Sequence, residues 1–224
     1  WDDALDRWAE GRRIANQAGD VVLAAQIGCN IGELRIHRGE LDAADEVLAE
    51  SRRVFRSVSA RTLATYAHVL QARVLIRRGE LREAESIAQD AEIEFATARL
   101  KGFVLEAALV RAESLTVAGR PEEALLVMEA ANDGPSDEGV ELLPRLHLQR
   151  ARALAAMGRR NEADEEAAAG LDLARAYGLP FDIGQLLLLT AELAHASGSD
   201  DVAHAAEAEA REILTGLGAL DAGR

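Results

Sequence analysis

A glycine recurs at intervals of 39 or 40 residues along this 224-residue sequence, at Gly39, Gly79, Gly119, Gly158 and Gly198. Two other positions keep the same period. An alanine stands five residues after each glycine, at Ala44, Ala84, Ala124, Ala163 and Ala203. A small residue stands seven residues before each glycine, at Gly32, Ala72, Ala112, Ala151 and Ala191. A fixed period of this size indicates an array of supersecondary units, each of which buries its apolar face against its neighbours.

Each glycine separates two segments whose apolar residues recur every three or four positions, the pattern of a helix with one buried face. Around Gly79 these segments are Leu63–Arg78 and Leu81–Ala98. A glycine suits the left-handed conformation that ends a helix, and an acidic residue after it, such as Glu80, favours the start of the next helix. Aromatic residues make up only 4% of the chain, which favours helices over strands. The repeated unit is therefore predicted to be a helical hairpin of about 40 residues.

The two columns of small residues predict where the helices of each hairpin cross. A large side chain at such a crossing would hold the backbones apart, and overpacking costs about 1–3 kcal/mol. The same close crossing in every hairpin gives every hairpin the same angle, and equal angles wind the array into a superhelix. We therefore predict an all-α, right-handed solenoid of about five and a half helical hairpins, forming one domain over residues 1–224.

The period also sets the expected repeat boundaries: hairpins at 21–60, 61–100, 101–138, 139–178 and 179–218, and a lone second helix at 1–18. The lone helix places Trp1 and Trp8 at large and aromatic positions of the repeat, as though its first helix had been cut away. The last helix is polar, as a terminal cap should be, so we expect the C-terminal part of a longer regulator. The turn-rich stretch Asn132–Gly139 should shorten the helix before it and form a mobile loop that is a candidate for function.

The small residue, the turn glycine and the alanine at these offsets resemble the tetratricopeptide repeat, and the resemblance covers essentially the whole chain. The 40-residue period is similar to that of longer tetratricopeptide-like repeats in bacterial signal-transducing ATPases, transcription activators and nucleotide cyclases. The resemblance implies that the first helices of the hairpins line a concave groove. A clamp for chaperone C-terminal carboxylates, found in some members, needs lysine and asparagine in this groove. The corresponding positions hold Cys29, Glu33, Val69 and Arg73, so we do not expect that clamp.

The groove columns that the resemblance implies lie at fixed distances before each glycine, on one face of each first helix. They give the candidate ligand-binding residues Gln26, Asn30, Glu33, Tyr66, Leu70, Arg73, Glu106, Leu109, Val110, Glu113, Arg145, Gln149, Arg152, Gln185, Leu189 and Glu192. The apolar members form a stripe with polar edges, which suits a helix or an extended peptide. About half of the apolar positions are expected to pack between repeats instead, because a buried residue makes many contacts.

One groove column, six residues before the glycines, alternates strictly in charge: Glu33, Arg73, Glu113, Arg152 and Glu192. Neighbouring helices should lie about 8–10 Å apart, so these charges face each other. They form either a polar floor that grips a peptide or a ladder of ion pairs between repeats. The ladder is the favoured interpretation, because alternating charges leave no net field to attract a ligand.

The composition excludes several classes of partner. The net charge of −14 and the pI near 4.8 repel nucleic-acid phosphates and anionic lipids, so we expect neither nucleic acid nor membrane as a partner. Cys29 is the one cysteine, which excludes an internal disulfide and fits a reducing compartment. No apolar run approaches the ~18 residues of a membrane span, and no signal peptide opens the sequence. We expect a cytoplasmic location.

Few residues suggest chemistry. Glu33 and His37 lie one turn apart, but no third ligand is evident, and zinc needs three or four. The acidic runs Glu162–Glu166 and Glu207–Glu212 are interpreted as solvated outer faces. No P-loop and no nucleophile elbow is present. We therefore expect no enzyme activity, no cofactor and no metal.

The function predicted from the sequence is a protein- or peptide-binding regulatory or scaffolding module. Two alternatives remain from other classes. A small-molecule sensor domain of a bacterial transcriptional regulator should show a closed pocket with stacked aromatic rings, whereas a peptide binder should show a long open groove. A self-association array should form homodimers through a face that contains Trp1 and Trp8.

Overall fold

The computed structural model describes residues 1–132 and 139–219, and within these residues it contains helices and no strands. The all-α prediction is confirmed. The helices are α1 (Asp2–Gln17), α2 (Val21–His37), α3 (Leu41–Ser57), α4 (Arg61–Arg78), α5 (Leu81–Thr97), α6 (Lys101–Val117), α7 (Pro121–Ala131), the 3₁₀ turn η1 (Val140–Leu142), α8 (Leu143–Ala156), α9 (Arg160–Tyr177), α10 (Pro180–Ser197) and α11 (Asp200–Leu217).

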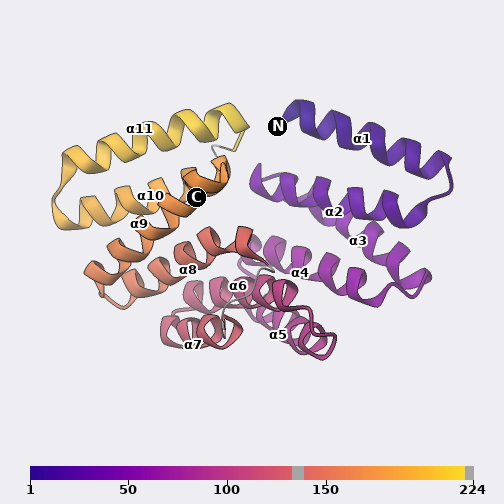
Figure 1. Ribbon diagram of the computed structural model, residues 1–224, viewed down its shortest axis with the longest axis horizontal. Helices are drawn as coiled ribbons and strands as arrows, with labels where there is room; N and C mark the ends of the chain where they lie inside the picture. The colour runs from indigo at the N-terminus through magenta and orange to yellow at the C-terminus, as the bar shows by residue number, and fades with distance from the viewer. Residues whose placement is uncertain (133–138, 220–224) are drawn as a thin grey trace.

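The helices form a solenoid of five hairpins preceded by the single helix α1, and each helix packs on the next one along the chain. The first helices of the hairpins, α2, α4, α6, α8 and α10, lie on the inner side of the curved array (Figure 1). The second helices, together with α1, form the outer layer. Any site on the concave side is therefore built from the first helices.

The repeat glycines adopt the predicted left-handed conformation, with φ between 75° and 80° at all five positions. At the end of α4, the Gly79 N–H donates to the carbonyl of Ile76 at 3.0 Å, and the Glu80 N–H donates to that of Leu75 at 2.9 Å. This pair of bonds satisfies carbonyls that the helix end would otherwise leave unpaired. The glycine thus turns the chain sharply enough for α5 to run back along α4.

The small-residue columns lie at the helix crossings, as predicted. All five alanines that follow the glycines have no accessible surface, and every member of the other column is buried. At Gly32, an added Cβ would lie only 2.6 Å from the side chain of Leu48 on the partner helix. The crossings therefore leave no room for larger residues.

The turn-rich stretch shortens α7 to 11 residues, as expected from the sequence. Residues 133–138, on which the predicted mobile loop falls, lie outside the described residues. The chain resumes at Gly139, whose φ is 77°, and passes through η1 into α8. Pro144 stands in the first turn of α8, where a proline costs no hydrogen bond.

The two ends of the array meet, which the sequence analysis did not predict. The Trp1 ring lies 5.6 Å from the rings of both His37 and Phe181, and His37 stacks on Phe181 at 4.0 Å. Trp1 and Phe181 also pack on a small cluster that includes Leu214. In Figure 1 the N-terminus accordingly lies beside the end of α11. The first and last hairpins thus close the concave side.

This contact changes the interpretation of the two tryptophans. Trp1 is partly buried against the far end of the chain, and Trp8 packs on the core of the first hairpin. Both rings are partly buried by contacts within the chain. Homodimer formation through this face stays a prediction.

We predict that the crossing alanines tolerate no enlargement. Ala163→Leu in α9 forces an isobutyl group into a crossing with no accessible surface, so the free energy of unfolding should fall by about 1–3 kcal/mol. Ala168 is exposed on the same helix, and Ala168→Leu should change stability by no more than about 0.5 kcal/mol. Urea denaturation followed by circular dichroism measures both variants. Equal losses would contradict the close crossing.

We also predict that two turns between hairpins gain stability from glycine. Ser59 and Arg99 are exposed and have φ of 58° and 59°, a conformation that costs a non-glycine residue about 1–2 kcal/mol. Glycine removes that strain but adds about 0.5–1 kcal/mol of chain entropy cost. Ser59→Gly and Arg99→Gly should each raise the unfolding free energy by up to about 1 kcal/mol. Gly79→Ala, at a matching left-handed position, should lower it, and a change of the same sign would contradict the prediction.

Candidate functional site

The concave side of the solenoid holds two adjoining cavities. The wide cavity, of about 770 Å³, lies between α2, α4 and α6 and includes Tyr66 and Phe103 in its wall. The narrow cavity, of about 370 Å³, is lined by all five inner helices and includes His37 and Phe181. Both cavities share Glu33 and Arg145. They therefore form one continuous concave site.

Most of the predicted groove residues line these cavities. The wide cavity contains Gln26, Asn30, Glu33, Tyr66, Glu106 and Arg145. The narrow cavity contains Glu33, Arg73, Glu113, Arg145, Gln149, Arg152 and Gln185. The structure brings this polar set together, and its role in binding stays a prediction.

The apolar groove residues are placed differently. The sequence predicts burial between repeats for about half of the apolar groove positions, but the structure buries all four of Leu70, Leu109, Val110 and Leu189, which are at most 4% exposed and belong to the hydrophobic core. Their columns face the neighbouring hairpins, where the array buries its spine. Glu192 is exposed but lines neither cavity.

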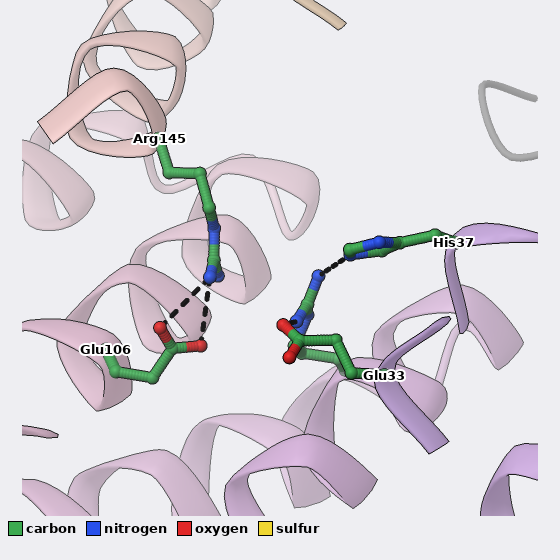
Figure 2. A network of polar contacts seen from close by, with 5 residues as sticks. Glu33, His37, Glu106 and Arg145 are labelled. Atoms are coloured by element: carbon green, nitrogen blue, oxygen red, sulfur yellow. Dashed lines mark hydrogen bonds and ion pairs between the residues drawn. The ribbon is translucent and has the colours of Figure 1, made fainter. Parts of the chain in front are cut away.

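Two ion pairs stand across the site from each other (Figure 2). Arg73 donates to Glu33 at 2.7 Å and to the Nε2 atom of His37 at 2.8 Å. Arg145 on α8 donates from Nη1 to both carboxylate oxygens of Glu106, each at 3.0 Å. Each arginine thus has its charge balanced by one carboxylate, and the site has little net field.

Among the described residues, the predicted ladder of ion pairs forms only its first pair, between Glu33 and Arg73. Glu33 and Arg73 pair as the ladder interpretation requires. Arg152 instead donates to the amide oxygen of Gln185 at 3.1 Å, and in the described part of the chain no ion pair joins it to Glu113 or Glu192. Arg152 therefore places a positive charge at the narrow cavity. The group that accepts its hydrogen bond is a neutral amide and not a carboxylate.

Two amides in the narrow cavity have unused hydrogen-bonding capacity. Gln149 and Gln185 are 6% and 7% exposed. The Oε1 atom of Gln149 and the Nε2 atom of Gln185 are buried, and among the described residues neither has a hydrogen-bond partner. Leaving a buried polar atom unpaired costs about 1–3 kcal/mol. Both residues line the narrow cavity.

Aromatic rings line both cavities. Tyr66 and Phe103 meet edge to face at 5.4 Å in the wide cavity, and the stacked His37 and Phe181 border the narrow one. Phe103 and Phe181 were not predicted as site residues, because they lie 16 and 17 residues before Gly119 and Gly198, beyond the groove columns, which end 13 residues before each glycine. One further turn back, at 16 residues, a column runs through Leu63, Phe103, Leu142 and Asp182, all of which line the site.

Burial sets the protonation of several groups in the site. It holds the pKa of His37 well below its ordinary value, and the cations of Arg73 and Arg145 lower it further. His37 is therefore neutral and accepts the hydrogen bond from Arg73. Burial raises the pKa of the Cys29 thiol to about 12, so the thiol stays protonated at neutral pH.

The pair Glu33 and His37 is committed to other contacts, since Arg73 bonds to both side chains. A different cluster has metal-ligand character. His195, His204 and Glu207 each offer a ligand atom within 4.8 Å of the other two. These residues lie on α10 and α11, and none of them lines the two cavities.

Comparison with known proteins identifies the fold alone. No family model matches the sequence, and no curated protein matches it. Among solved structures, the chain is similar to the crystal structure of BtubC (BKLC) from P. vanneervenii, with a TM-score of 0.55 and 17% sequence identity. The match covers 96% of this chain and 90% of that one. Within the described residues, no helix has the length and apolar character needed to cross a membrane.

We predict that acid destabilises the fold through His37. In the unfolded chain this imidazole binds a proton near its ordinary pKa of about 6.5, whereas in the folded chain it stays neutral to much lower pH. Below about pH 6.5 the unfolded state therefore binds more protons, and the unfolding free energy falls by up to about 1.4 kcal/mol per pH unit. His37→Gln, whose amide oxygen can still accept from Arg73, should lose less.

Urea denaturation between about pH 7.5 and pH 5.5 tests this difference, since that interval brackets the titration of the unfolded imidazole. The lowered pKa of His68 acts in the same direction in both proteins and cancels in the comparison. Parallel stability curves for the wild type and His37→Gln would contradict the prediction.

Proposed function

We propose that this chain is a regulatory ligand-binding module that holds a small polar molecule in the two adjoining cavities. The observation that carries the proposal is the pair of buried amides, Gln149 and Gln185, which line the narrow cavity and each hold one unpartnered atom. Folding leaves these atoms unpaired at a free-energy cost that a bound ligand offsets. This supports the sensor alternative over the peptide groove.

The size and closure of the site agree with a small ligand. Pockets for small molecules are typically about 300–1,000 Å³, the range into which both cavities fall. The contact between Trp1 and Phe181 closes the concave side, and aromatic rings border both cavities. The stacked rings of His37 and Phe181 are the feature expected of a sensor domain that supports this proposal.

The charges suggest which groups the ligand carries. Arg73 and Arg145 are neutralised by their carboxylate partners, whereas Arg152 donates to the neutral Gln185 amide and has no carboxylate partner among the described residues. An acceptor-rich or anionic group fits beside Arg152 and Gln185 in the narrow cavity. The wide cavity, with Tyr66 and Phe103, accommodates an apolar body.

A peptide segment is the second candidate. The two cavities adjoin and together touch all five inner helices, which supports binding of a short extended chain as well as a compact molecule. Membership of the tetratricopeptide-repeat family and a role in a larger bacterial regulator belong to the same proposal, and they rest on the repeat offsets in the sequence.

Ligand binding is testable with the tryptophan that borders the site. Trp8→Phe leaves Trp1 as the one indole in the chain, beside His37 and Phe181. We expect a saturable change in Trp1 emission, and a raised melting temperature, with members of a panel of amino acids, small organic acids, monosaccharides and nucleosides. Short synthetic peptides form the second arm of the experiment.

Variants of the two glutamines identify the site. Gln149→Leu removes a buried unpaired atom, so stability without ligand should be unchanged or raised. Gln185→Leu also removes the acceptor of the Arg152 hydrogen bond, so its stability without ligand should fall by about 1–3 kcal/mol. Affinity should fall about 10-fold or more, because the ligand loses a partner worth about 1–3 kcal/mol. Gln89→Leu, an exposed position on α5, is the control. Binding by peptides alone would favour the second candidate, and affinities unchanged in both variants would overturn the proposed site.

A further inference from the structure

A cluster of nitrogen and oxygen ligands joins the two helices of the last hairpin. His195 lies in the last turn of α10, and His204 and Glu207 lie three residues apart on one face of α11. Each of the three residues offers one possible ligand atom, and these three atoms all lie within 4.8 Å of one another. The Nε2 atom of His195 is 3.0 Å from a carboxylate oxygen of Glu207.

The separation between His195 and Glu207 is close to that of neighbouring ligand atoms around a bound zinc ion. With zinc–nitrogen and zinc–oxygen bonds of about 2.0–2.2 Å in a tetrahedron, neighbouring ligand atoms lie roughly 3.3 Å apart. The distance of 3.0 Å between the Nε2 atom of His195 and the Glu207 carboxylate oxygen is close to this value. His204 is exposed, so its side chain is free to rotate toward the other two.

A fourth residue orients the histidine. The Nδ1 atom of His195 lies 3.3 Å from a carboxylate oxygen of Asp200. A carboxylate that accepts from one ring nitrogen fixes the tautomer and directs the other nitrogen toward the metal, as partners of zinc-bound histidines commonly do. Without a cation, Nε2 of His195 donates to the Glu207 carboxylate. A bound cation takes the place of that proton, which is released, while Asp200 continues to accept from Nδ1.

The geometry points to a site for a divalent transition-metal ion, zinc above all, at His195, His204 and Glu207, with Asp200 as a positioning residue. Two imidazoles and one carboxylate are ligands that suit zinc, and a water molecule completes the tetrahedron. The chain's net charge of −14 favours cations near its surface. Because the ligands come from both sides of the Gly198 turn, the ion joins α10 to α11 and stabilises the terminal hairpin.

The experiment uses untagged, chelator-treated protein of the full chain and zinc chloride. Titration calorimetry should show saturable binding of one zinc ion per chain, and zinc should raise the melting temperature. Cobalt(II) as a probe should give the visible absorption of a tetrahedral site. His195→Ala and His204→Ala should abolish these signals, and Asp200→Asn should weaken binding about 10-fold.

His147→Ala is the matched control, since His147 also bonds to a glutamate, Glu166 at 2.6 Å, but belongs to no such cluster among the described residues. This variant should bind zinc like the wild type. Circular dichroism should show that each variant keeps its helices. The inference is overturned if no saturable binding occurs, or if His204→Ala and His147→Ala bind zinc equally.

Discussion

The structure depends on the close approach of two helices at crossings where only alanine or glycine fits. Ala72, Ala84 and their equivalents are completely buried, and a Cβ on Gly32 would overlap Leu48. Because each hairpin closes to the same depth, the angle between successive hairpins repeats, and the curvature of the array is the sum of these angles. The shape of the concave site therefore depends on this accumulated curvature. Its inner helices carry the polar residues, but the crossings determine how near those residues come to one another.

The fold could be predicted from the sequence because its determinants lie within one repeat. The turn at Gly79, the crossing at Ala84 and the helices on either side are local features, and the sequence states them five times over. The contact between Trp1 and Phe181 has no such local signal, since it follows from the accumulated curvature of all the hairpins. A small error in the angle per repeat would separate these rings.

The candidate site was predictable only in part, for a related reason. The helical period places Gln149 and Arg152 on the inner face of α8, and the structure agrees. The same period places Leu109 on the inner face of α6, but the neighbouring hairpins cover it, and how far neighbours overlap depends on the packing of three helices. Which charged residues form ion pairs was harder still to predict. Arg145 reaches Glu106 on α6, a choice of rotamer and neighbour that the alternation of charge along one column could not reveal.

His37 belongs to two parts of the molecule at once. Its Nε2 atom accepts a hydrogen bond from Arg73 inside the concave site, while the face of its ring stacks on Phe181 where the two ends of the solenoid meet. His37 therefore joins the wall of the cavity to the contact that holds the two ends of the solenoid together, so one side chain serves both the site and the closure of the array.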